Sequence, residues 1–153
     1  MRPFALLASI AVTLAAAAAA HAADIEARGA WIRATAPGAT TAAGYLTLTN
    51  HGLSDRLLGG RTGAAGDLQV HEMSMAGGVM RMRPIPGGLA IGASQTVRLA
   101  PGGNHLMLIG LKHPLTAGQH VKVVLRFQRA GDVAVDFDVR DGESSGGMGG
   151  MHM

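Results

Sequence analysis

The chain has 153 residues, enough for one domain with a buried core, and its 13 basic and 10 acidic side chains leave a small positive charge. With one tryptophan, one tyrosine and no clustered basic stripe, the sequence does not favour a nucleic-acid partner. The absence of cysteine excludes a blue-copper centre, a zinc ribbon, a thiol nucleophile and a redox dithiol.

Residues 1–22 have the pattern of a secretory signal peptide. A short basic start precedes an almost unbroken apolar run, which ends in the small-x-small pattern Ala20-His21-Ala22. A retained membrane anchor is the alternative, but the run is alanine-rich and short for a span. No cysteine lies at the junction, so the pattern does not indicate a lipid anchor. We therefore predict an exported protein that is cleaved near Ala22.

The region from residue 23 to residue 141 is predicted to be one all-β domain. Short runs rich in Val, Leu, Ile and Thr alternate with Gly, Pro, Asn and Asp, and no pattern predicts a long helix. About eight to nine short strands at this spacing predict a Greek-key β-barrel or sandwich. The expected strands are Ile25–Arg33, Gly44–Asn50, Asp55–Leu58, Leu68–Ser74, Val79–Pro84, Thr96–Ala100, His105–Leu111, His120–Gln128 and Val133–Arg140.

Two segments lack a strand pattern. Ala34–Thr41 is predicted to be a loop. Residues 142–153 are rich in glycine and have no apolar periodicity, so we expect a disordered tail. The tail is interpreted either as a solvated low-complexity segment or as an accessory metal site, and its candidate ligands are Met148, Met151, His152 and Met153.

The stretch VHEMSMAGGVMRMR, residues 70–83, combines one histidine with four methionines and is predicted to be a β-hairpin. A two-residue turn at Ala76-Gly77 would pair His71 directly with Met82. A three-residue loop would instead turn Met82 to the face opposite His71. We expect the even loop, because it also leaves the charged side chains of the hairpin on the other face: Glu72, Arg81 and Arg83.

A second histidine and methionine follow in NHLML, where His105 and Met107 share one face of a predicted strand. Two imidazoles and two thioethers form a neutral, soft donor set. Such a set favours Cu(I), with Ag(I) as a mimic, whereas zinc prefers thiolates, imidazoles and carboxylates. The sequence therefore predicts a Cu(I) site whose ligands are His71, Met82, His105 and Met107.

Other methionines and histidines are interpreted more simply. A single methionine in a strand usually packs in the core, and a single histidine usually makes a structural hydrogen bond. Three further methionines of the hairpin are expected to pack or to form a thioether rim beside the site: Met73, Met75 and Met80. No metal role is predicted for His51, His113 or His120.

These motifs resemble the periplasmic copper chaperones called PCu(A)C. That family has a histidine, a methionine about ten residues later, and an H-x-M pair about twenty residues beyond it. Here ten residues separate His71 from Met82, and 22 more lead to His105-Leu106-Met107. The stretches HEMSMAGGVMRMRP, PGGNHLMLIGLKHPL and GQHVKVVLRF are also similar to the family. The resemblance covers Ala27 to Val139, although Ala76 stands where an acidic turn residue is common and only some members have a Met-His tail.

The resemblance implies a cupredoxin-like β-barrel in the periplasm with Cu(I) bound at the four positions named above. It also implies copper delivery to the dinuclear copper centre of cytochrome c oxidase subunit II, often alongside Sco-type thiol chaperones. Tails of this type are associated with extra copper capture, including Cu(II).

Three other hypotheses remain beside the chaperone. A copper buffer or resistance protein without a dedicated partner would need the same ligands. A β interaction module would use the methionines only for packing. An enzyme is not expected, because the sequence has neither a G-x-S-x-G nor an H-E-x-x-H motif, and two thioethers bias a copper site towards one oxidation state.

Overall fold

The computed structural model describes residues 22–142, so the predictions for residues 1–21 and for the tail ligands from Met148 onward lie outside the described residues. Ten strands follow one another along the chain, and none of the described helical residues forms a segment long and apolar enough to cross a membrane. The strands are β1 (Ile25–Arg33), β2 (Thr41–Asn50), β3 (Asp55–Thr62), β4 (Ala65–Ala76), β5 (Val79–Pro84), β6 (Leu89–Ile91), β7 (Thr96–Leu99), β8 (His105–Leu111), β9 (His120–Phe127) and β10 (Gly131–Arg140).

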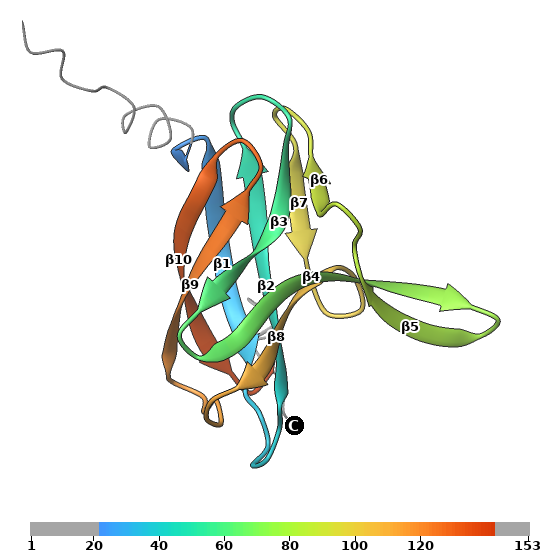
Figure 1. The fold of residues 1–153 in the computed structure, drawn as a ribbon, viewed down its shortest axis with the longest axis vertical. Helices are drawn as coiled ribbons and strands as arrows, with labels where there is room; N and C mark the ends of the chain where they lie inside the picture. Colours follow the sequence, from blue (N-terminus) through green and yellow to red (C-terminus); the bar gives the residue numbers. More distant parts are fainter. Residues whose placement is uncertain (1–21, 143–153) are drawn as a thin grey trace, which may run out of the picture.

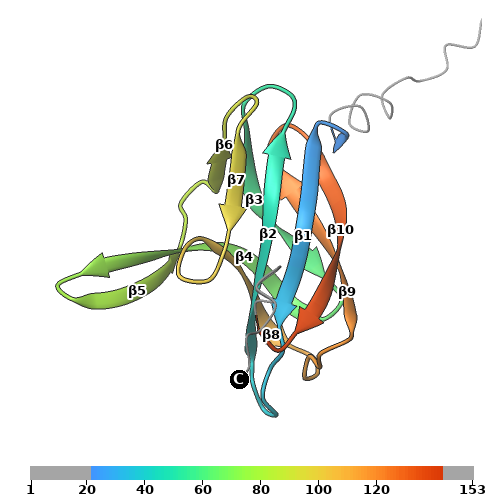
Figure 2. The same ribbon diagram turned by 180° about the vertical axis from the view of Figure 1, so that it is seen from behind.

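Seven of these strands close into a barrel in the order β4, β8, β2, β1, β10, β9 and β3 (Figures 1 and 2). The ring closes where Gly60 of β3 lies opposite Leu68 of β4. Neighbouring strands are antiparallel except for β1 and β10, which run parallel. Strands β6 and β7 extend β3 and β2 outside the ring. This architecture confirms the prediction of an all-β, cupredoxin-like barrel.

The expected strands agree well with the observed ones. Three of them, β1, β5 and β8, have the predicted ends. The prediction of about eight to nine strands missed β6, a three-residue strand between glycine-rich turns that is too short to show an alternating pattern. Most differences at the other strands are extensions, such as that of β2, which begins at Thr41 inside the predicted loop.

Alternation along the strands builds the core. In β9, for example, Val121, Val123, Leu125 and Phe127 are buried while the residues between them are more exposed. Phe137 from the neighbouring strand β10 is fully buried in the same cluster. Because every second residue faces inward, the same strands carry a second set of side chains on the outer surface of the barrel.

Strand β4 leaves the barrel halfway along its length. Its pairing with β8 ends at His71, and from there it continues only with β5 as a projecting hairpin (Figures 1 and 2). We call this hairpin, residues 72–84, the arm. Its turn is Gly77-Gly78, and both glycines have positive φ angles, 59° and 76°. That is the backbone of a type I′ turn, in which glycine is favoured at both positions.

Candidate metal centre

The site lies where the arm leaves the barrel. His71 of β4 is directly opposite His105 of β8 at the last position of that strand pair, and the two ring centroids are 5.8 Å apart. Side chains that are directly opposite share one face of a sheet. The neighbouring residues Val70 and Leu106 are core residues, so the two histidines belong to the outer face of the barrel.

The register of the arm differs from the predicted one by two residues. Met82 lies opposite Met73, and His71 lies opposite Pro84. The predicted direct pairing of His71 with Met82 is therefore wrong, because the turn is Gly77-Gly78 and not Ala76-Gly77. Both turns contain two residues, so the parity is unchanged and Met82 still shares a face with His71.

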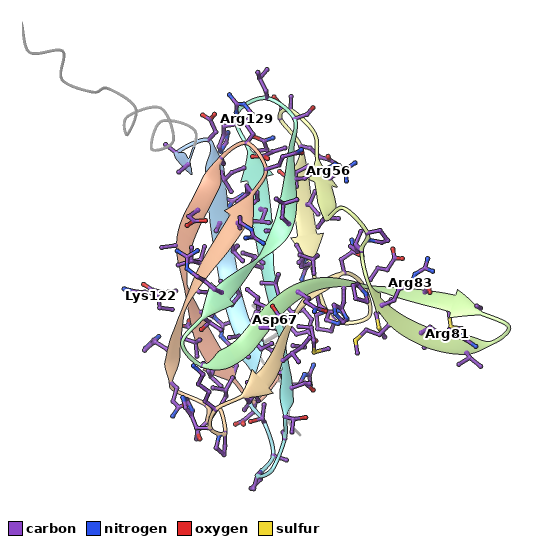
Figure 3. The ribbon with its side chains drawn as sticks, in the orientation of Figure 1. Arg56, Asp67, Arg81, Arg83, Lys122 and Arg129 are labelled. Carbon is purple, nitrogen blue, oxygen red and sulfur yellow. The ribbon has the colours of Figure 1, made fainter. Side chains whose placement is uncertain are left out.

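The face opposite the site holds the charges of the arm, as predicted. Glu72 lies opposite Arg83, and the Arg83 Nε donates to the Glu72 carboxylate over 2.7 Å. Arg81 lies opposite Ser74 on that same face, and Figure 3 shows the labelled Arg81 and Arg83 out along the arm. The face of the arm that holds Met82 and shares its side with His71 therefore carries no basic side chain.

His105 already contacts a thioether. Its Nδ1 donates to the carbonyl oxygen of Gly103 over 3.1 Å, and its Nε2 lies 2.9 Å from Sδ of Met82. A backbone carbonyl can only accept, so Nδ1 carries the proton of the neutral ring and Nε2 presents a lone pair. Two lone-pair donors, one nitrogen and one sulfur, thus lie side by side, where one soft cation beside them could bind both.

His71 offers a second nitrogen. Its Nε2 is 2.9 Å from the side-chain oxygen of Gln69, and its Nδ1 is buried without a hydrogen-bond partner among the described residues. A buried unpartnered nitrogen is costly unless a further group binds it. Burial lowers the pKa of His71 below its ordinary value, and the neighbouring His105 lowers it further. Both effects favour the neutral imidazole, which is the form that binds a metal ion.

The predicted ligand Met107 lies beside His105 in the barrel wall. It follows His105 by two residues on the same face of β8 and lies opposite Gln69 of β4. Its side chain is buried, whereas Met82 is 49% exposed. Three of the four predicted ligands are therefore buried in the barrel wall, and Met82 contacts one of them, His105, from the arm.

Two aromatic rings stand next to the histidines. Tyr45 lies 6.4 Å from His105 between ring centroids, and Trp31 lies 4.8 Å from Tyr45. Both rings are buried, and the guanidinium of Arg33 sits 5.8 Å from the Trp31 ring. The two buried rings thus form an aromatic cluster beside His105.

The donor chemistry suits a soft metal ion. Within residues 22–142, no three His, Asp, Glu or Cys side chains gather as a metal-binding group. The thioethers beside the two imidazoles supply further donors, which bind Cu(I) well and hard cations poorly. The two imidazoles and the Met82 sulfur fit that requirement.

The remaining methionines of the hairpin lie farther out. Met73 is half-buried opposite Met82, and Met75 and Met80 form an exposed pair nearer the turn, on the site face. The arm therefore carries a continuous row of thioethers, which is the arrangement predicted for a rim.

Sequence reasoning missed several residues of this site. Gln69, Gly103 and Tyr45 were not selected, although the first two hydrogen-bond the histidine rings. The pattern Asp67-x-Gln69-x-His71, with polar residues at alternate positions of a strand, was the available signal. No local pattern indicated Gly103 or Tyr45, because their positions depend on how distant strands pair.

The comparisons with known proteins identify the family and support the fold. Residues 25–139 match the family described as "Putative lipoprotein LpqE-like". A curated relative, the putative lipoprotein Lxx21020 of Leifsonia xyli subsp. xyli (strain CTCB07), is 38% identical over 117 residues, which are 76% of this chain and 70% of the relative. The chain belongs to the LpqE-like family. The relative's name indicates an exported protein, as predicted here, although the present sequence contains no cysteine.

Solved structures place this family among the PCu(A)C domains, as the sequence motifs predicted. The copper-bound PCuAC domain from PmoF2 is 25% identical with a TM-score of 0.65, and the match covers 78% of this chain and 94% of that one. The Cu(I) form of DR1885 from Deinococcus radiodurans is 32% identical with a TM-score of 0.60, covering 74% of this chain and 76% of that one. The apo form of DR1885 is 30% identical with a TM-score of 0.59 and covers 94% and 95%.

Proposed function

We propose that this protein is an exported copper chaperone that carries one Cu(I) ion between His71, Met82, His105 and Met107. The observation that supports the proposal best is the contact between His105 Nε2 and Met82 Sδ beside the unpartnered Nδ1 of His71. The likeness to copper-binding domains, which are not an enzyme family, supports a binding role over catalysis.

The division of the ligands suits a carrier. A carrier must hold its ion tightly enough to transport it and still release it to an acceptor. The two imidazoles and Met107 are buried and would hold the ion in place. Met82 is half-exposed and can be exchanged for a ligand of the acceptor. Release would begin at Met82, because only this ligand stands on the projecting arm (Figure 1).

The proposed acceptor is the dinuclear copper centre of cytochrome c oxidase subunit II, with a Sco-type chaperone as a further partner in the periplasm. This part of the proposal rests on the likeness to PCu(A)C proteins. The Met75–Met80 pair is proposed as the rim over which the ion passes, because it continues the row of thioethers outward from Met82.

Copper binding is tested by anaerobic Cu(I) titration of the chain from Ala23 onward against a competing chelator. The four tail residues Met148, Met151, His152 and Met153 are changed to alanine, so that only the barrel site is measured. We expect about one tightly bound Cu(I) ion, and Zn(II) binding far weaker, because the donors are soft and neutral. Comparable affinities for Zn(II) and Cu(I) would contradict the proposed donor set.

Delivery is tested separately from binding. The Cu(I)-loaded protein is mixed with the reduced apo soluble domain of oxidase subunit II, and copper transfer is followed by copper analysis of the separated proteins. A one-electron oxidant is then added, and the absorbance of the mixed-valence dinuclear centre reports its assembly. In cells, loss of a chaperone lowers oxidase activity when copper is scarce, whereas loss of a buffer raises sensitivity to excess copper. Normal oxidase activity combined with copper sensitivity in the deletion strain would identify a buffer instead.

A further inference from the structure

Three polar side chains form a hydrogen-bonded row on the outer face of β4. The amide nitrogen of Gln69 donates to the Asp67 carboxylate over 2.9 Å, and the amide oxygen of Gln69 lies 2.9 Å from His71 Nε2. The other oxygen of Asp67 accepts the backbone N–H of Leu68 over 2.8 Å. The row begins at exposed Asp67, passes through half-buried Gln69 and ends at buried His71. Figure 3 shows Asp67 on the part of β4 that belongs to the barrel.

The partners fix the direction of each hydrogen bond. An ionised carboxylate only accepts, so the amide nitrogen of Gln69 must face Asp67 and its oxygen must face His71. That oxygen also only accepts, so the Nε2 of His71 carries the proton. In the neutral ring the lone pair is then on Nδ1, which is the buried nitrogen without a partner.

His105 is held in the opposite tautomer. The Gly103 carbonyl accepts from Nδ1 of His105, so its lone pair is on Nε2, next to Met82. The two rings therefore keep their lone pairs on different nitrogens. One ring is oriented by a backbone carbonyl, which substitution cannot remove, and the other by the side chain of Gln69.

We infer that Gln69, anchored by Asp67, is a positioning residue that sets His71 to bind copper through Nδ1, while His105 binds through Nε2. The inference deepens the proposed function and rests on it for the identity of the ion. Partners that hold the second nitrogen of a metal-binding histidine fix its tautomer and orientation, and their loss lowers metal affinity by roughly 10–100-fold. The tautomer of the metal-free protein can be tested without any copper.

The first measurement is the long-range ¹⁵N–¹H correlation spectrum of the imidazole rings in the metal-free chain. We expect His71 to carry its proton on Nε2 and His105 to carry its proton on Nδ1. Addition of Cu(I) should then shift the ¹⁵N resonance of His71 Nδ1 and that of His105 Nε2 the most. A proton on Nδ1 of His71, or a copper-induced shift centred on His71 Nε2, would overturn the inference and leave the proposed function intact.

Substitution of Gln69 separates positioning from packing, because Gln69 also lies opposite Met107. Gln69→Leu keeps a side chain of comparable bulk but removes the acceptor, and we expect a mixed or reversed His71 tautomer with about 10–100-fold weaker copper binding. Gln69→Glu retains an acceptor for Nε2 and should keep the wild-type tautomer. Gln128→Leu, at an exposed glutamine distant in sequence from both histidines, is the matched control and should change neither quantity.

The outcomes of these measurements distinguish the positioning role of Gln69 from the proposed copper-binding function. If Gln69→Leu keeps both the tautomer and the affinity of the wild type, Gln69 is not a positioning residue. A loss of affinity with an unchanged His71 tautomer would assign Gln69 a packing role against Met107 and also overturn the inference. If the wild type does not bind Cu(I) although its apo tautomers are as expected, the proposed function fails while the positioning of His71 stands.

Discussion

The two halves of β4 carry similar side-chain alternation but lie in different surroundings. Up to His71 the strand is part of the closed barrel, and its inward residues Leu68 and Val70 are core. Beyond His71 it pairs only with β5, and most residues of the arm are exposed. The metal site proposed at this boundary would take its imidazoles from the barrel wall and one thioether from the projecting hairpin. In the proposed site, the buried residues of the barrel would hold the ion, and the exposed arm would release it. Binding and release would then depend on separate parts of one sheet.

The largest expected effect is loss of an imidazole from the wall. His105→Ala removes the nitrogen that contacts Met82, and we expect Cu(I) affinity to fall by more than about 100-fold, the upper range for loss of an outer partner. Competition with a Cu(I) chelator measures the change. His113→Ala, at an exposed histidine outside the site, is the control and should bind as the wild type does. Equal affinities for His105→Ala and the control would remove His105 from the ligand set.

A smaller effect is expected for the thioethers, and here the arm and the wall can be compared directly. Met82→Leu and Met107→Leu each remove a sulfur but preserve volume, so the apo protein should lose less than about 1.5 kcal/mol of unfolding free energy. Copper affinity should fall by about tenfold or more, equivalent to about 1.4 kcal/mol. Urea unfolding and chelator competition measure the two quantities.

Met75→Leu is the matched control for Met82→Leu, because it changes an exposed thioether on the same face of the arm. It should leave the affinity of the barrel site unchanged and slow only the transfer of copper to the acceptor. If Met107→Leu strongly destabilises the apo protein without weakening copper binding, the methionine is a packing residue and the four-ligand site is wrong.

The sequence was a better guide to strands and faces than to pairing. The ends of β1, β5 and β8 followed from alternation bounded by turn residues. The face of Met82 was predicted correctly, because any loop with an even number of residues puts Met82 and His71 on the same face of the hairpin. The turn itself was misplaced because Ala76-Gly77 would need an alanine at positive φ, whereas Gly77-Gly78 supplies glycine at both positions.

The long-range contacts of the site could not be predicted from local patterns. His71 and His105 are separated by 33 residues, and their opposition depends on the register between β4 and β8. The same register determines that Gln69 lies opposite Met107. That register joins strands that are distant in sequence, and Tyr45 comes near His105 from β2, a strand that the hairpin motif does not contain.

A third prediction concerns pH and the buried part of the site. Burial and His105 hold the pKa of His71 below 6.5 in the folded protein, while the unfolded chain returns to about 6.5. Above pH 6.5 both states have a neutral ring and His71 contributes no pH dependence. As the pH falls from 6.5 through the folded pKa, the unfolded state binds the proton more readily, so the folded state loses stability.

His71→Gln should therefore make the unfolding free energy of the apo protein less sensitive to pH below 6.5. Urea unfolding between about pH 7.5 and 5 measures the slope. The residues beside His71 on its face are His105 of β8, Pro84 of β5, and Gln69 and Met73 of its own strand, whereas Glu72 belongs to the opposite face. His113→Gln controls for the loss of a histidine elsewhere. An identical pH slope for His71→Gln and wild type would contradict the lowered pKa.

The smallest effect is expected at the turn of the arm. In Gly78→Ala the new Cβ meets no atom within 4 Å, so the substitution acts only through the positive φ, which costs an L-residue roughly 1–2 kcal/mol. Because the arm contributes no core residue, this cost should appear as faster amide exchange in β5 and not as a shift in global unfolding. Copper affinity should fall less than in Met82→Leu, since the thioether remains and only its position becomes less well defined.

Gly63→Ala, whose new Cβ also meets no atom within 4 Å but which has no positive φ, is the matched control. If Gly78→Ala lowers the global unfolding free energy by the full cost of the turn, the arm and the barrel unfold as one unit. That result would contradict the proposed division between buried ligands in the barrel and an exchangeable ligand on the arm.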